Sequence, residues 1–155
     1  ENYLYILKPL LYTNFLCIPI CGIILTYIFA RKNMIKLRRI ILIFGILCLG
    51  YCIVIYNSNS NTVVSNVYGH TIKLQLENYF YYMSLIVNSI FRIMGINLFS
   101  RRYSNKLGAS LIAISASITL IAVVLTSINT SYNFLLLGDI SWILTMDYAL
   151  MKVKR

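Results

Sequence analysis

The sequence predicts an all-α fold, a polytopic bundle of transmembrane helices, and two observations indicate it. Of the 155 residues, 59% are hydrophobic and only 12% are charged, whereas about a quarter of the residues of an ordinary soluble domain are charged. A soluble domain of this length could not bury so much apolar surface. The apolar residues also stand in long runs separated by short polar or basic segments, which is the pattern of helices that cross a bilayer.

We expect one membrane domain over residues 1–155, with four spans from residue 40 onward and a further segment before them. The first segment, 9–30, contains Pro19 and Gly22, and it either crosses the membrane or re-enters on the side where it began. The next run is uncharged and stops at the polar stretch "NSNSN", which opens an expected loop up to Glu77. The four expected spans are 40–57, 78–99, 107–128 and 133–151.

The basic residues predict the orientation of these spans. The net charge is +10, and the basic clusters lie directly against apolar runs, which indicates contact with anionic lipid headgroups and excludes nucleic acid as the expected partner. Alternate loops are rich in lysine and arginine, and this marks them as cytoplasmic. The clusters are Arg31, Lys32, Lys36, Arg38 and Arg39, then Arg101, Arg102 and Lys106, then Lys152, Lys154 and Arg155. The intervening loops hold one lysine, Lys73, and are expected outside.

Four residues near the outer ends of the spans are candidates for a ligand pocket. Asp139 and Trp142 lie in the outer half of the last span, and Tyr79 and Tyr82 lie at the outer start of the span 78–99. An interfacial aromatic belt with a neighbouring carboxylate explains all four without a ligand. The alternative is an outward-facing pocket lined by these side chains. Arg92, inside the same span as the tyrosines, is expected to extend its long side chain to the cytoplasmic interface.

Other patterns predict packing rather than chemistry. Ala109, Ala113 and Ser117 recur every four residues, as in helices that approach each other closely. The four cysteines fall in apolar runs away from the sole histidine, His70, so we expect small apolar side chains rather than metal ligands. They are Cys17, Cys21, Cys48 and Cys52. No catalytic or cofactor-binding motif is present in the sequence, and we expect neither an enzyme nor a cofactor or metal.

Four stretches resemble the N-terminal part of the insect gustatory receptor family. They are "ILKPLLYTNFLCIPICG", "ARKNMIKLRR", "RIMGINLFSRRYSNKL" and "GDISWILTMDYALMKVKR". The resemblance implies a seven-helix protein with a cytoplasmic N-terminus, a first segment that dips into the membrane, and assembly as a tetrameric ligand-gated cation channel. Two features depart from the family: the loop between the spans 78–99 and 107–128 is short, and the final pore-lining helix is missing. We therefore expect a fragment of a longer chain.

The expected function is that of a chemosensory receptor, a ligand-gated cation channel subunit in the plasma membrane, as a fragment without the pore helix. The resemblance implies a small-molecule tastant, a lipid bilayer and a homo- or hetero-oligomer as its partners. One alternative is a small accessory subunit of a multi-subunit complex, for example a respiratory complex of the mitochondrial inner membrane. The other is part of a transporter in which Arg92 pairs with Asp139 or Asp147.

Overall fold

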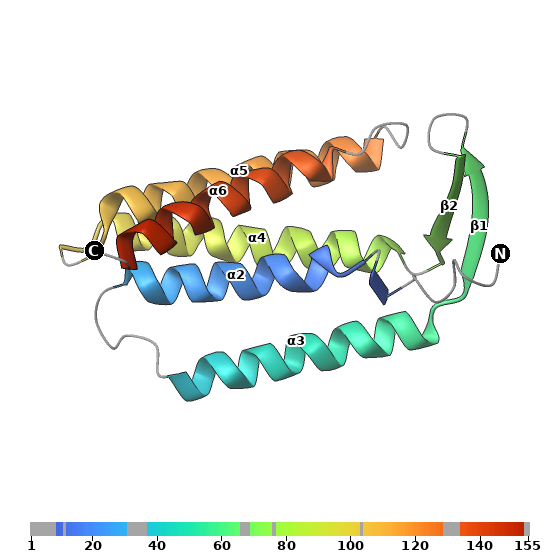
Figure 1. The fold of residues 1–155 in the computed structure, drawn as a ribbon, viewed down its shortest axis with the longest axis horizontal. Coiled ribbons are helices and arrows are strands. Elements are labelled where there is room, and N and C mark those ends of the chain that lie inside the picture. The colour runs from blue at the N-terminus through green and yellow to red at the C-terminus, as the bar shows by residue number, and fades with distance from the viewer. Residues whose placement is uncertain are drawn as a thin grey trace.

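The protein is a bundle of helices with a β-hairpin at one end (Figure 1). The computed structural model describes residues 9–10, 12–30, 37–65, 69–75, 77–102, 104–128 and 134–153, and only the backbone at 37–40, 60–65 and 69–73. Within these ranges the elements are α2 (Asn14–Phe29), α3 (Leu37–Asn57), β1 (Ser60–Ser65), β2 (Gly69–Leu74), α4 (Glu77–Phe99), α5 (Lys106–Ile128) and α6 (Leu135–Val153). The helical class expected from the sequence is therefore confirmed.

The number of membrane-spanning helices expected from the sequence is not confirmed in the described part of the chain. Helices α4 and α5 are long and apolar enough to cross a membrane, and they match the expected spans 78–99 and 107–128 within one residue. The apolar stretch described in α3, Ile41–Asn57, is shorter than a full span. Helix α6 is continuous, but the charged residues Asp139, Asp147 and Lys152 interrupt its apolar sequence. Among the residues that the structure describes, two helices rather than four thus have both the length and the composition of a span.

The first segment of the chain does not turn back within the described residues. Helix α2 continues through Pro19 and runs from the hairpin end to the opposite end of the bundle (Figure 1). Proline removes one backbone donor from a helix, yet no break follows, and further along the Thr26 hydroxyl donates to the Gly22 carbonyl at 2.7 Å. The Tyr51 hydroxyl, late in α3, donates to the Pro9 carbonyl, which fixes the start of this segment near the hairpin.

The segment between α3 and α4, expected to be a loop, contains a β-hairpin. Strands β1 and β2 pair antiparallel, with Ser60 opposite Leu74 and Ser65 opposite Gly69. Both strands contain β-branched residues, "TVV" in β1 and "TI" in β2, and such residues favour extended backbone. The polar stretch "NSNSN", which runs into β1, is typical of a loop, so the sequence predicted no strand here. The fold is therefore a helical bundle with one hairpin rather than purely helical.

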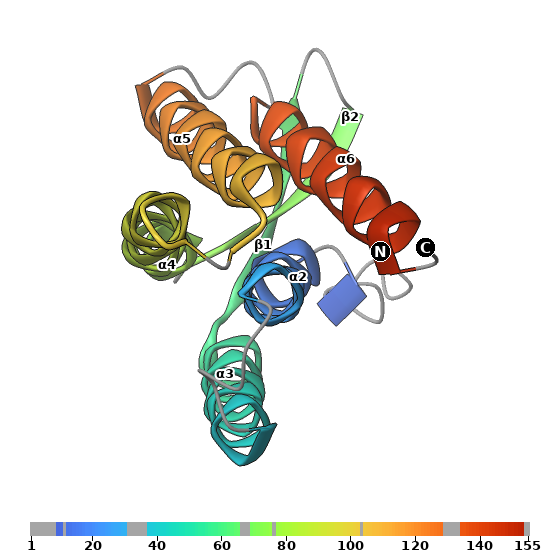
Figure 2. The same ribbon diagram turned by 90° about the vertical axis from the view of Figure 1, so that its left-hand side faces the viewer.

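The core lies between α2, α4, α5 and α6, with α3 outside it against α2 (Figure 2). The buried cluster at its centre consists of Leu25, Phe29, Phe91, Ile112, Ala116, Trp142 and Ala149. By contrast, none of the side chains described on α3, residues 41–57, is buried. The bundle therefore has four well-packed helices and a fifth that leaves most of its surface uncovered.

Helices α4 and α5 approach each other closely at Gly95. A Cβ atom added there would lie 2.9 Å from the backbone nitrogen of Ala113 and 3.0 Å from the carbonyl oxygen of Ala109. Ala109 is fully buried, and Ser117, half-buried two turns along, donates its hydroxyl to the Ala113 carbonyl at 2.8 Å. The small residues singled out in the sequence thus lie along α5, where two of them face α4.

Hydroxyl groups inside the bundle are satisfied by the helices that carry them. Thr119, Thr126 and Thr145 each donate to the backbone carbonyl four residues earlier, at 2.8–2.9 Å. Such bonds let hydroxyls lie in apolar surroundings without an unpaired donor. Ser115 Oγ also lies 2.6 Å from Thr145 Oγ1, which joins α5 to α6 through a buried polar contact.

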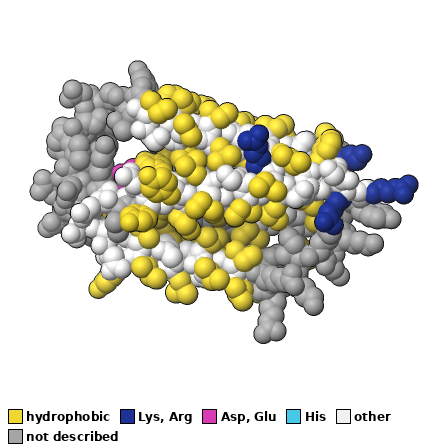
Figure 3. All heavy atoms as spheres, turned by 180° about the vertical axis from the view of Figure 1, so that it is seen from behind, with side chains coloured by type: hydrophobic (Ala, Val, Ile, Leu, Met, Phe, Trp, Pro, Cys, Tyr) yellow, Lys and Arg dark blue, Asp and Glu magenta, His cyan; other side chains and the backbone are white. Residues whose placement is uncertain are grey.

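The described lysine and arginine side chains gather at the end of the bundle opposite the hairpin, apart from Arg92 (Figure 3). Arg101 and Arg102 follow α4, Lys106 begins α5, and Lys152 lies in the last turn of α6, so the antiparallel arrangement brings them to one end. The remaining residues of the expected orientation signal lie outside the described side chains. They are Arg31, Lys32, Lys36, Arg38, Arg39, Lys154 and Arg155.

Candidate functional site: a polar cavity beside an apolar groove

The half of the bundle nearer the hairpin contains a cavity of about 130 Å³. Its walls come from the first two turns of α2 and α6, from the second and third turns of α4, and from one residue each of α5 and α3. The lining residues are Asn14, Phe15, Ile18, Pro19, Leu47, Met83, Ser84, Val87, Asn88, Thr119, Leu135, Leu136 and Asp139. The cavity is thus mostly apolar, with a small group of polar side chains that converge from four helices, as small-molecule sites commonly have.

Asn88 of α4 presents an unpaired acceptor in the wall of this cavity. The side chain is 2% exposed, and its Nδ2 donates to the Ser84 carbonyl at 2.8 Å and to Ser84 Oγ at 3.2 Å. A carbonyl oxygen only accepts hydrogen bonds, so the orientation of the Asn88 amide is fixed. Its Oδ1 is buried without a hydrogen-bond partner among the described residues. Leaving a buried acceptor unsatisfied costs about 1–3 kcal/mol.

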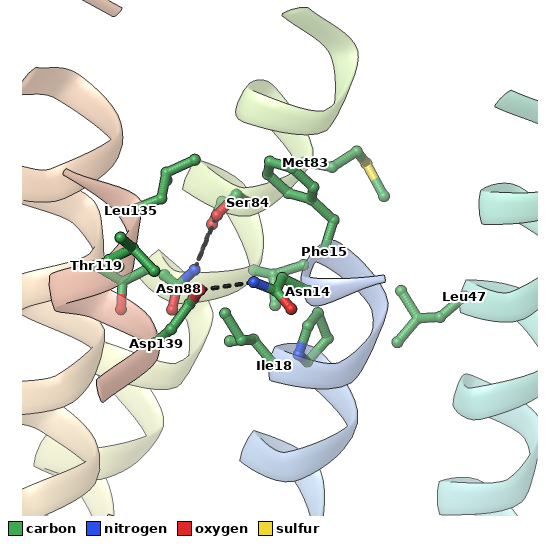
Figure 4. Close-up of a pocket in the computed structure, with 13 residues that line it drawn as sticks. Asn14, Phe15, Ile18, Leu47, Met83, Ser84, Asn88, Thr119, Leu135 and Asp139 are labelled. Carbon is green, nitrogen blue, oxygen red and sulfur yellow. Dashed lines mark hydrogen bonds between the residues drawn. The ribbon is translucent and has the colours of Figure 1, made fainter. Parts of the chain in front are cut away.

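Asp139 of α6 places a carboxylate at the same cavity (Figure 4). Its Oδ2 accepts a hydrogen bond of 2.7 Å from Asn14 Nδ2 at the start of α2. This contact joins residues 125 positions apart and links the hairpin ends of α2 and α6. Among the residues that line the cavity, Asp139 is the one with a formal charge. Asp139 is therefore the residue that can give the polar side of the cavity a negative charge.

Trp142 lies behind the cavity and is coupled to it through Thr119. The indole is 2% exposed, and its Nε1 donates to Thr119 Oγ1 at 3.0 Å. Thr119 in turn donates its hydroxyl to the Ser115 carbonyl, so its only proton is already used. The edge of the indole packs against Phe91, with ring centroids 5.5 Å apart. Because the chain has one tryptophan, its fluorescence reports on this region alone.

An apolar groove of about 560 Å³ lies beside the cavity, between α2 and α6. It is lined by Asn14, Cys17, Ile18, Cys21, Leu136, Asp139, Ile140, Trp142, Ile143, Met146, Asp147 and Leu150. Four of these residues also line the cavity, including both partners of the Asn14–Asp139 hydrogen bond. The cavity and the groove therefore meet at this hydrogen bond.

Aromatic rings pack where the helices approach the hairpin. Phe80 of α4 stacks on Tyr12 with ring centroids 5.6 Å apart, and on Phe15 of α2 at 5.2 Å. Tyr51 of α3 packs against Phe80 at 6.0 Å. Since Phe15 also lines the cavity, this cluster forms part of its outer wall.

The structure brings together only part of the pocket that the sequence suggested. Asp139 lines both the cavity and the groove, and Trp142 lines the groove. Tyr79 and Tyr82 line neither, and their side chains are 60% and 63% exposed. It is Tyr81 that turns inward: its ring lies 5.8 Å from that of Phe15, and its hydroxyl donates to Glu77 at 2.5 Å. Whether any of these side chains contacts a ligand stays a prediction.

Four polar residues of the cavity were missed in the sequence: Asn14, Ser84, Asn88 and Thr119. For Asn88 a signal existed, because an amide within the apolar run "SLIVNSIF" is costly in lipid unless it has a function or a partner. Asn14 and Thr119 carry no comparable signal, since an amide at a helix start and a threonine in a helix are common. Their role depends on which helices come together.

The described residues contain no group of three or more His, Cys, Asp or Glu side chains that could hold a metal ion. The four cysteines are free thiols; Cys17 and Cys52 are exposed, and Cys21 and Cys48 are half-buried. No protein-family model matches this chain, and no curated protein or solved structure shows significant similarity to it.

Proposed function

We propose that this chain is the membrane-embedded, ligand-binding part of a small-molecule receptor, with α3 and α6 crossing the bilayer beside α4 and α5. The outer faces of all four helices expose large apolar side chains, for example Leu42, Ile86, Ile121 and Ile143. Contiguous apolar surface of this kind is unfavourable in water and favourable in lipid. Of the three charges on α6, Asp139 lines the cavity and the groove, Asp147 lines the groove, and Lys152 lies at the basic end.

The distribution of charge supports an orientation with the basic end in the cytoplasm and with the hairpin and the cavity outside. A crossing α2 then brings Pro9 to the outer side, because α2 begins at the hairpin end. The gustatory receptor resemblance implies instead a cytoplasmic N-terminus and a first segment that dips into the membrane. The continuous α2 argues against that part of the resemblance.

The observation that carries the receptor proposal is the unpaired Oδ1 of Asn88 in a cavity that also holds a carboxylate. A buried polar group without a partner costs free energy, and a ligand that donates a hydrogen bond would recover it. The chemoreceptor resemblance supports the same function, with the plasma membrane as location and cation conduction by an oligomer as output. Binding would shift a closed–open equilibrium only as far as the ligand prefers one state.

Ligand-evoked current in cells that express the natural full-length protein tests this proposal. A panel of water-soluble tastants would be applied to the wild type, to Asn88→Leu and Asp139→Asn, and to Asn97→Leu as the matched control, because Asn97 is exposed on α4 and lines neither the cavity nor the groove. We expect the two cavity variants to need at least about tenfold more ligand, which corresponds to about 1.4 kcal/mol, and the control to respond like the wild type. Absence of any evoked current, or equal responses from all variants at equal surface expression, would refute the proposal.

A structural subunit of a larger membrane complex is the second candidate, and the exposure of α3 favours it. A Cβ added at Gly45 or Gly50 would meet nothing within 4 Å, so most of this helix is free to pack against another chain. A partner on α3 should co-purify with the protein in mild detergent and should be lost when Ile46, which is exposed, is replaced by Trp. Purification without a partner would argue against this candidate. The transporter alternative gains no such support, because Arg92 is exposed on α4 and Asp139 is bonded to Asn14.

A further inference from the structure

We propose that the site binds an amphipathic primary amine, with the ammonium group between the carboxylate of Asp139 and Oδ1 of Asn88 and the apolar tail in the α2–α6 groove. This inference rests on the proposed function, because it names the chemical class of ligand for the same cavity. It is carried by three features: the polarity of the lining atoms, the shape of the cavity and groove, and the distribution of charge.

The lining atoms offer hydrogen-bond acceptors and few free donors. Asn88 Oδ1 is an unpaired acceptor, and in its carboxylate form Asp139 only accepts. Most donors nearby are already used: one Asn14 Nδ2 proton on Asp139, the Asn88 Nδ2 protons on the Ser84 carbonyl and hydroxyl oxygens, and the Thr119 hydroxyl on Ser115. A primary ammonium has three donors and a positive charge, so it matches both acceptors at once. A carboxylate or phosphate ligand would face Asp139 with a like charge.

The shape of the site separates a small polar compartment from a larger apolar one. The cavity of about 130 Å³ suits a head group, and the groove of about 560 Å³ is lined mainly by isoleucine, leucine and other apolar side chains. The two meet at the Asn14–Asp139 contact. Asn14 occupies only Oδ2 of the carboxylate, which leaves Oδ1 for the ammonium. A head group bound there can thus extend its tail directly into the groove.

The charges of the bundle favour a cation at this end. Neither the cavity nor the groove is lined by a lysine or arginine. The described side chains of Arg101, Arg102, Lys106 and Lys152 all belong to the opposite end, as the positions of their elements show. Asp139 and, at the start of α4, Glu77 are the charged side chains described near the hairpin. A patch of one sign raises the local concentration of ions of the other sign.

The test uses the full chain in phosphatidylcholine nanodiscs, with the fluorescence of Trp142 as the readout. The probes are hexylamine, hexanol and hexyltrimethylammonium, which share a tail and differ in charge and in N–H donors. We expect hexylamine to bind at least tenfold more tightly than the other two. Asp139→Asn and Asn88→Leu should each reduce this preference to less than threefold. Asn97→Leu, on α4 but outside both the cavity and the groove, should retain it, which also controls for partitioning of the probes into lipid.

Two outcomes separate the failure of this inference from the failure of the receptor proposal. If hexanol and hexylamine bind the wild type equally, or if both cavity variants keep the preference, the site binds ligands but the amine class is wrong. If no probe changes Trp142 fluorescence in a wild type whose helical circular dichroism is intact, both proposals fail. Should Asp139→Asn not fold, Asn88→Leu carries the same expectation.

A further arm identifies the source of the ammonium group. Aminophospholipid head groups and free amines share this chemistry, so the titration is repeated in nanodiscs that contain phosphatidylethanolamine. Weaker apparent binding of hexylamine there would show that the lipid head group competes for the site. Unchanged binding would assign the site to free amines, and either result supports an ammonium site.

Discussion

Replacing Gly95 with alanine should destabilise the bundle, although the same change stabilises most helices. Alanine is favoured over glycine in a helix interior by about 1 kcal/mol. At Gly95, however, the new Cβ would lie 2.9 Å from a backbone nitrogen and 3.0 Å from a backbone carbonyl oxygen of α5. Backbone atoms cannot turn aside as a flexible side chain can, so we take the upper part of the usual overpacking cost, about 3 kcal/mol. The net expectation is a loss of about 2 kcal/mol.

Thermal unfolding followed by circular dichroism in one detergent measures this effect. For a chain of this size a change of 1 kcal/mol shifts Tm by about 2–4 °C, so Gly95→Ala should lower Tm by about 4–8 °C. Gly45→Ala is the matched control, because nothing lies within 4 Å of the added Cβ, and its Tm should rise by about 2–4 °C. At Gly95 the added Cβ would also lie 3.0 Å from the Ala113 Cβ. Adding Ala113→Gly to Gly95→Ala removes this third contact and should recover part of the loss. An unchanged or higher Tm for Gly95→Ala would refute the close packing of α4 and α5.

Three other predictions concern packing, access and orientation. Ser115→Ala and Thr145→Val each remove one partner of the 2.6 Å hydroxyl contact. A double-mutant cycle of unfolding free energies from the Tm values should show a coupling of about 0.6 kcal/mol between them. Additive effects of the two substitutions would contradict a stabilising contact. Cys17 and Cys52 are both exposed, but of the two only Cys17 lines the groove with Asp139. A cationic methanethiosulfonate should therefore modify a variant that keeps only Cys17 faster than one that keeps only Cys52. Equal rates would count against a water-accessible groove. A glycosylation acceptor inserted between β1 and β2 should be modified in microsomes while one fused after Arg155 should not, and the reverse pattern would invert the proposed orientation.

The sequence predicted where the helices begin and end far better than how the segments between and before them fold. The spans 78–99 and 107–128 were located within one residue because polar or basic residues flank both runs. The hairpin was missed because its strands are short and their β-branched residues follow a polar stretch typical of a loop. The path of the first segment stayed open, since Pro19 and Gly22 fit a break as well as a continuous helix.

The candidate site was predictable only for the residues that stand out in their own segment. Asp139 was noticed because a carboxylate within an apolar run is costly in lipid, and the structure places it in the cavity wall. Tyr79 and Tyr82 were named as pocket candidates because of their expected depth in the membrane. That depth does not determine which side of a helix faces the core. The unpaired state of Asn88 Oδ1 depends on the packing of α2, α5 and α6 against α4, which one segment of sequence does not contain.

The position of α2 has a consequence for the order in which the bundle is assembled. Helix α2 packs mainly against α6, α4 and α5, and less against α3, its neighbour in the sequence. If the bundle lies in a membrane as proposed, α2 enters it during synthesis before any of its main partners exists. We expect α2 and α3 to remain separate helices in lipid until the later helices are synthesised, because lipid tails solvate apolar helices as well as a protein neighbour does. The hydrogen bond between Asn14 and Asp139 can form only after α6 has joined the bundle. The cavity is therefore complete only when all of the helices that line it have assembled.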